Sequence, residues 1–112
     1  MFTLKPFGVV AKPAEPLWKR VPCRDTDGHP VSDFMMLIPG LRGWPAQRQL
    51  RALDAIYQVL NNYRNVVVFA DLNVRINVLW VSVRTVPGIC MELPIALRER
   101  VPEAKLVAHR AS

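Results

Sequence analysis

The chain has 112 residues and a mass of 12.7 kDa, which is enough for one compact domain and too little for two. Hydrophobic residues make up 51% of the chain and charged residues 21%, a balance that argues against a disordered chain or a basic tail. The 15 basic and nine acidic residues give a net charge of +6, which favours an anionic partner and leaves the fold open.

Residues 1–31 are predicted to form an extended, proline-rich arm. Half of the ten prolines fall in this segment, and no helical spacing of apolar residues persists there. The arm also carries several large apolar side chains, so we expect part of it to pack against the domain or against a partner. The segment Asp25–Gly28 is typical of a turn, because Asp and Gly tolerate the backbone geometry of a chain reversal. Residues 32–112 are predicted to form the domain itself, with the α+β fold that their element order indicates.

The first strand is predicted in the apolar run Phe34–Ile38, which ends at a Pro-Gly pair. A loop, Gly40–Trp44, follows this strand. A helix is then predicted from Pro45 to about residues 61–62, since proline is favoured at the first helical position and asparagine at a helix end. Its buried face is predicted from apolar residues at steps of three and four, which are Leu50, Leu53, Tyr57 and Leu60.

Two adjacent antiparallel strands are predicted between residues 66 and 83. Thirteen of these eighteen residues are apolar and many are β-branched, a composition that favours strands. The segment Asp71–Arg75 divides the run and is interpreted as a hairpin connection. The segment Thr85–Gly88 then ends the second strand.

A second, shorter helix is predicted from about Met91 to Val101. Its buried face consists of apolar residues four apart, which are Leu93, Leu97 and Val101. Pro94 fits this helix only in the first turn, which would move the start to residue 92 or 93; otherwise the helix kinks there. A proline ends the helix, and residues 105–110 are predicted to form a final strand.

The element order over residues 32–112 is strand, helix, strand, strand, helix, strand. This order predicts an α+β, ferredoxin-like fold, in which two helices cover one face of a four-stranded antiparallel sheet. Successive residues of a strand point to opposite faces of the sheet, and all five residues of the segment 66–70 are apolar. Both faces of the sheet are therefore expected to be buried. The second face is therefore expected to be covered by the arm or by a second copy of the chain.

Patterns that carry catalytic or metal chemistry are scarce in this sequence. Cys23, Asp25, Asp27 and His29 alternate as C-x-D-x-D-x-H, which matches no tetrahedral zinc spacing. His29 and His109 have no evident partner residues and are interpreted as surface or loop side chains. The chain also contains no GxGxxG, Walker A or GxSxG run. We therefore predict neither a metal nor a cofactor.

Cys90 is the one candidate nucleophile. It follows Pro87 and Gly88 and would lie near the start of the second helix, where the helix dipole lowers the pKa of a thiol. A small thiol-dependent enzyme is therefore one alternative function. The other interpretation of Cys90 is an ordinary buried side chain, since free cysteine is among the most buried residue types.

The loop between the first strand and the long helix is a candidate ligand site. Two glycines, an arginine and a tryptophan lie where backbone amides and a helix N-terminus converge, an arrangement that often holds ligands. The alternative is a tight connection in which the tryptophan acts as a hydrophobic cap. The candidate ligand-binding residues are Gly40, Leu41, Arg42, Gly43 and Trp44.

The element order, the run Pro39-Gly40-Leu41 after the first strand and the apolar sheet resemble small ACT-like regulatory modules. The resemblance covers residues 33–110. It implies a ferredoxin-like fold, pairing of two copies and a small ligand held at an interface. It also marks Gly40, Leu41 and Gly43 as ligand-loop positions.

The expected function is that of a cytoplasmic, homodimeric binding or regulatory module. The first ten residues lack the apolar stretch of a secretory signal, and the longest apolar run is far too short to span a membrane. A basic nucleic-acid-binding domain is the rival hypothesis. The positive charge is dispersed along the chain, however, and the strands lack the aromatic RNA-binding run of an RRM. A modest basic patch is expected from Arg42, Arg48 and Arg51.

Overall fold

The computed structural model describes residues 2–5, 8–11 and 30–110, and the side chains of residues 30–107. Within this part of the chain, the strands are β1 (Phe2–Lys5), β2 (Gly8–Ala11), β3 (Val31–Leu37), β4 (Val67–Asn73), β5 (Val78–Arg84) and β6 (Lys105–Arg110). The helices are the short 3₁₀ turn η1 (Leu41–Gly43), α2 (Ala46–Asn62) and α3 (Ile89–Arg100).

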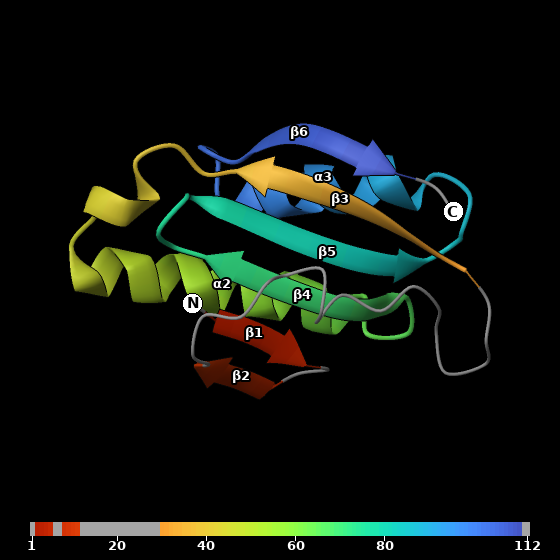
Figure 1. The fold of residues 1–112 in the computed structure, drawn as a ribbon, viewed down its shortest axis with the longest axis horizontal. Helices are drawn as coiled ribbons and strands as arrows, with labels where there is room; N and C mark the ends of the chain where they lie inside the picture. Colours follow the sequence, from red (N-terminus) through yellow and green to blue (C-terminus); the bar gives the residue numbers. More distant parts are fainter. Residues whose placement is uncertain (1, 6–7, 12–29, 111–112) are drawn as a thin grey trace.

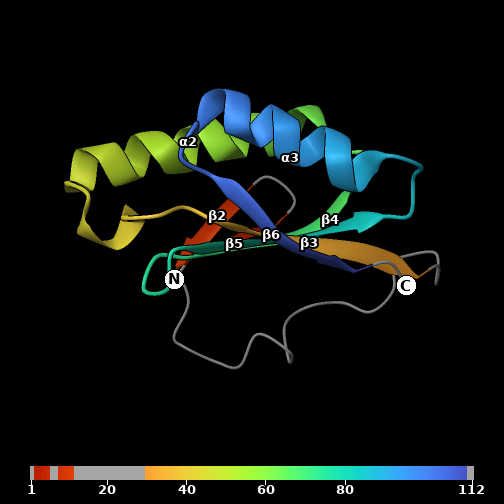
Figure 2. The same ribbon diagram turned by 90° about the horizontal axis from the view of Figure 1, so that it is seen from above.

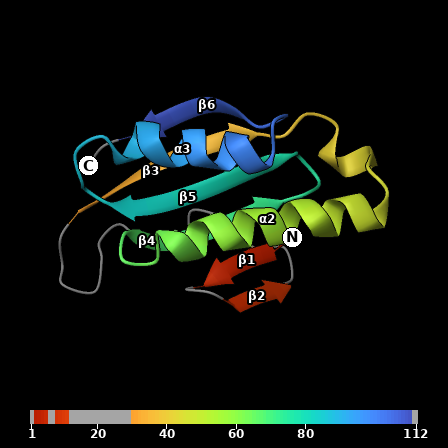
Figure 3. The same ribbon diagram turned by 180° about the vertical axis from the view of Figure 1, so that it is seen from behind.

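The described strands form one antiparallel sheet in the order β2-β1-β4-β5-β3-β6 (Figure 1). The four strands β3 to β6 and the two α-helices follow each other as β-α-β-β-α-β. Both helices lie on one side of the sheet (Figure 2), and they run side by side in opposite directions (Figure 3). The predicted α+β class, the four-stranded antiparallel sheet and the element order are thus confirmed, and they are consistent with a ferredoxin-like fold.

The segment 1–31 contributes two strands in its described part. β1 and β2 pair with each other, and β1 also pairs with β4, so that the hairpin extends the sheet at one edge. Residues 12–29 lie outside the described residues. The predicted turn at Asp25–Gly28 and the C-x-D-x-D-x-H pattern fall in that segment.

The hydrophobic core lies between the helices and the sheet. The strands contribute fully buried side chains such as Phe34, Met36 and Val81. The buried residues of α2 are Ala52, Leu53, Ile56, Val59 and Leu60. The predicted stripe is therefore right at Leu53 and Leu60 but wrong at Leu50, which is 59% exposed. Leu50 lies about 120° around the helix axis from the centre of the buried stripe, at 100° per residue.

The β4–β5 hairpin turns later than predicted. Asp71 and Leu72 belong to β4 and are buried, and the turn comprises residues 74–77. Two asparagines build this turn: the Oδ1 atom of Asn73 accepts a hydrogen bond from the N–H of Arg75 at 3.1 Å, and Asn77 has a positive φ of 61°. The place of Asp71 in a buried strand runs against local preference, since aspartate is rare in strands.

Helix α3 begins earlier than predicted. Its first residue is Ile89, after Gly88 with a φ of 78°, so Pro94 lies in the second turn rather than the first. The predicted start at about Met91 is therefore two residues late, and the condition that Pro94 lies in the first turn is not met. Pro94 has no N–H to donate to the carbonyl of Cys90, and its side chain is buried. The predicted apolar face is confirmed, since Leu93, Leu97 and Val101 are buried.

The sheet is also buried on the side away from the helices. Strand alternation places Asp33, Phe69, Asp71 and Ser82 on this side, and each is at most 5% exposed. Asp33 and Ser82 are directly opposite each other on β3 and β5. The expectation that both faces are buried thus holds for these residues. Coverage of the second face by the arm or by a second copy stays a prediction.

Candidate functional site

The predicted ligand loop folds into η1, and its backbone amides bond within the protein. The N–H groups of four consecutive residues each donate a hydrogen bond of 2.7–3.2 Å. The pairs are Leu41 with the Ile38 carbonyl, Arg42 with the Asn77 side chain, Gly43 with the Gly40 carbonyl and Trp44 with the Leu41 carbonyl. Because these donors are already used, they form no open cradle for an anion.

The carbonyl groups of the same loop are held from α2. The Nε2 atom of Gln49 donates to the carbonyl of Leu41 at 2.8 Å and to that of Arg42 at 3.2 Å. The side chain of Leu41 is fully buried. Gly40 has a φ of 80°, and a Cβ at this position would lie 3.3 Å from the indole nitrogen of Trp44. The loop is therefore a tight connection that fixes the position of Trp44.

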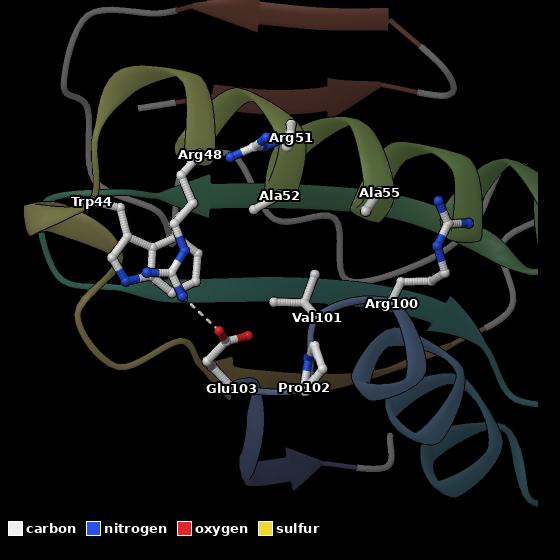
Figure 4. A pocket seen from close by; sticks show the side chains of 9 residues that line it. All are labelled: Trp44, Arg48, Arg51, Ala52, Ala55, Arg100, Val101, Pro102 and Glu103. Atoms are coloured by element: carbon white, nitrogen blue, oxygen red, sulfur yellow. Dashed lines mark hydrogen bonds and ion pairs between the residues drawn. The ribbon is translucent and has the colours of Figure 1, made fainter.

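Trp44 lines a surface groove of about 250 Å³ between the first half of α2 and the connection from α3 to β6 (Figure 4). The other lining residues are Arg48, Arg51, Ala52, Ala55, Arg100, Val101, Pro102 and Glu103. Among the five predicted loop residues, only Trp44 lines the groove. In the predicted basic patch, Arg48 and Arg51 line it, whereas Arg42 does not.

Three side chains form a bridge across the groove. The guanidinium carbon of Arg48 lies 3.8 Å from the ring centroid of Trp44, within the range of a cation–π contact. The Nη2 atom of the same guanidinium lies 2.7 Å from Oε2 of Glu103 (Figure 4). The side chains of Arg48 and Glu103 are 45% and 41% exposed, so this ion pair contributes at most about 1 kcal/mol.

The other two arginines of the groove differ in their hydrogen bonds. The Nη2 atom of Arg100 donates to Oε1 of Gln58 at 2.9 Å, and Gln58 donates in turn to Asp54 at 2.8 Å. Arg51 makes no hydrogen bond or ion pair with any residue that the structure describes. Three arginines and one glutamate give the groove lining a formal charge of +2. The groove thus presents unused guanidinium donors beside an aromatic ring.

Sequence reasoning did not identify Arg100 and Glu103. Arg48 and Glu103 are 55 residues apart, and only the antiparallel packing of α2 against α3 brings them together. No local spacing indicates such a pair. Arg48 and Arg51 are three residues apart on one helix, so they lie on the same side of it. This spacing could have indicated the α2 side of the groove.

Cys90 lies near the start of α3, as predicted. It is the second residue of the helix, partly buried and without a disulfide partner. Burial raises the pKa of the thiol above its ordinary value, and the nearby carboxylate of Asp33 raises the pKa further. This direction is opposite to the lowering expected from the helix N-terminus. The thiol is therefore protonated at neutral pH, which disfavours its use as a nucleophile.

No group of three or more His, Cys, Asp or Glu side chains within the described residues is placed to hold a metal ion. His29 lies outside them, and for His109 only the backbone, in β6, is described. None of the described helices is long and apolar enough to span a membrane. Comparisons with family models, with curated proteins and with solved structures each found no significant match to this chain.

Proposed function

We propose that this protein is a small binding module that holds a small anion in the groove formed by Trp44, α2 and the α3–β6 connection. The observation that carries this proposal is the presence of three arginines around one hollow, with Arg51 unpaired within the described residues. Guanidinium groups suit carboxylates and phosphates because their N–H donors match the spacing of two oxygen atoms.

The contact between Arg48 and Trp44 supports anion binding at this place. Stacking on the indole ring holds the Arg48 guanidinium in one orientation before a ligand arrives. Fewer side-chain conformations are then lost on binding, which favours affinity. The indole ring itself is held by the short η1 turn.

The size and charge of the groove indicate the class of ligand. Its volume of about 250 Å³ lies below the ~300–1,000 Å³ that is typical of sites for drug-sized ligands. A formal charge of +2 is matched by a ligand with two negative charges. The ligand class that fits best is a small dianion, either a dicarboxylate or a phosphate group.

The proposal also includes the type of module, its self-association and its compartment. The element order supports a ferredoxin-like, ACT-like regulatory module. Self-association through the sheet is supported by β6, which pairs with β3 on one side and has no neighbour among the described strands on the other. A reducing, cytoplasmic compartment is supported by the free thiol of Cys90.

Isothermal titration calorimetry with inorganic phosphate and with succinate tests the anion site. The comparison is between wild-type protein, Arg51→Gln and the matched control Arg64→Gln, whose arginine is exposed just beyond α2 and away from the groove. We expect Arg51→Gln to weaken binding about tenfold, as for the loss of a charge-assisted hydrogen bond, and Arg64→Gln to leave it unchanged. Equal affinities for all three proteins, or no binding by wild-type protein, would refute the proposal.

A further inference from the structure

We infer that Glu103 occupies the position of the ligand's acidic group and acts as a built-in competitor for the anion site. This inference rests on the proposed function and concerns the regulation of the same groove. The Oε2 atom of Glu103 lies 2.7 Å from Nη2 of Arg48, while Arg48 remains stacked on Trp44. The stacked guanidinium therefore already binds a carboxylate, the chemical group that we propose for the ligand.

The exchange of one carboxylate for another costs little free energy. Both members of the ion pair are more than 40% exposed, and a pair this exposed is weak because water competes for both charges. An incoming anion reaches the Arg48 guanidinium directly from solvent. It also gains contact with Arg51, which lines the same groove and pairs with no side chain in the described part of the chain. The ligand therefore has one more favourable interaction than the side chain that it displaces.

The backbone around Glu103 indicates which atoms move. Glu103 belongs to the connection between α3 and β6, and its neighbours Val101 and Ala104 are buried in the core at 4% and 2% exposure. The Ala104 N–H also donates to the Val101 carbonyl at 3.0 Å. The connection is thus anchored on both sides of Glu103. Displacement requires rotation of the Glu103 side chain, with no opening of the loop.

Release of Glu103 changes the charge that the ligand meets. With its carboxylate turned away, Arg48 and Arg51 have no acidic partner among the lining side chains, whereas the guanidinium of Arg100 is directed away from Arg48 and bonds to Gln58 (Figure 4). The lining then carries only the charges of its three arginines, a formal +3 in place of +2. We therefore expect a dianion to bind more tightly than a monoanion of the same size.

Removal of the Glu103 charge tests the competition. Calorimetry with phosphate and with succinate is carried out on wild-type protein, Glu103→Gln and the control Glu99→Gln. Glu99 is an exposed acid of α3 that does not line the groove. We expect Glu103→Gln to bind both probes roughly two- to fivefold more tightly, the worth of an exposed ion pair, and Glu99→Gln to match wild type. If Glu103→Gln raises the affinity for succinate and for phosphate equally, the site is a general anion site. If it raises only the affinity for phosphate, the ligand is a phosphate.

A second readout uses wild-type protein and does not depend on any variant. The ¹³C resonance of the Glu103 side-chain carboxyl is followed by NMR as phosphate is added. We expect it to move with the same midpoint as the calorimetric titration. Phosphate binding by wild type that Arg51→Gln weakens, together with an unchanged or weaker affinity of Glu103→Gln, overturns the inference and leaves the proposed function standing. If neither wild-type protein nor Glu103→Gln binds phosphate, both the inference and the proposed function are overturned.

Discussion

The Oδ1 atom of Asn77 accepts a hydrogen bond from the backbone N–H of Arg42 at 2.7 Å. The backbone carbonyl of Asn77 accepts a second bond, from Ile38, at 2.8 Å. One residue of the β4–β5 turn therefore holds both the end of β3 and the η1 turn that follows it. Because Trp44 comes directly after η1, Asn77 contributes to the position of the indole ring at the groove.

Substitution of Asn77 is expected to lower stability by two separable effects. Asn77→Gly keeps the backbone conformation of φ 61° and loses the bond to Arg42, which costs about 1 kcal/mol. Asn77→Ala also forces alanine into the left-handed region, which adds about 1 kcal/mol or more. Urea unfolding of the three proteins gives the free energies. Asn77→Ala as stable as wild type would contradict this account.

Gly40 and Gly43 flank the same turn and are expected to respond differently to alanine. Gly40 has a φ of 80° and lies against the Trp44 indole, whereas nothing lies within 4 Å of a Cβ at Gly43. We expect Gly40→Ala to reduce the free energy of unfolding by about 1–2 kcal/mol and to weaken phosphate binding by shifting Trp44. Gly43→Ala serves as the control, with stability unchanged or slightly higher. If the two substitutions lower the free energy of unfolding equally, the positive φ of Gly40 and its contact with Trp44 are not the cause of the loss.

Arg48→Lys separates charge from geometry in the groove. Lysine keeps the positive charge but has neither the planar group that stacks on Trp44 nor the paired donors for an anion. We expect phosphate to bind roughly two- to fivefold more weakly, the worth of an exposed cation–π contact. The control is Arg98→Lys, an exposed arginine of α3 outside the groove. An affinity for phosphate that is unchanged in Arg48→Lys would show that the stacking contributes nothing.

The raised pKa of Cys90 predicts a pH dependence of stability. In the unfolded chain the thiol ionises near pH 8.5, whereas the folded protein holds it protonated to higher pH. The unfolded state therefore loses its proton first, so the free energy of unfolding falls as the pH rises above about 8.5. Cys90→Ala, in a Cys23→Ser background, is expected to reduce that fall. Urea unfolding between about pH 7 and pH 10 measures the difference, and identical slopes with and without Cys90 would show that this thiol is not the cause of the fall.

Most of the fold follows from local patterns in the sequence. The spacing of Leu53 and Leu60, and of Leu93 and Leu97, predicts two helices because each pair lies on one buried face. The short apolar runs rich in β-branched residues predict the central strands. The errors occur where the tertiary structure prevails over local preference: Asp71 lies in a buried strand, and Pro94 lies buried inside α3.

The candidate site was predictable only in part. A loop with two glycines and a tryptophan suggests a ligand site, and Trp44 does line the groove. The Arg42 amide is bonded internally because Asn77, which is 35 residues away, folds back onto the turn. The amides of residues 41, 43 and 44 bond to nearby backbone carbonyls. The ion pair between Arg48 and Glu103 likewise depends on how α2 packs against α3. Such long-range contacts leave no regular spacing in one sequence.

An NMR titration with inorganic phosphate tests the central claim most directly, because each backbone amide reports its own change. If the groove is the anion site, the shifts concentrate in residues 44–52 and 100–103, share one midpoint and are suppressed in Arg51→Gln. Shifts that centre on exposed arginines elsewhere, such as Arg64 or Arg75, or that survive unchanged in Arg51→Gln, would contradict the claim that this groove binds a small anion.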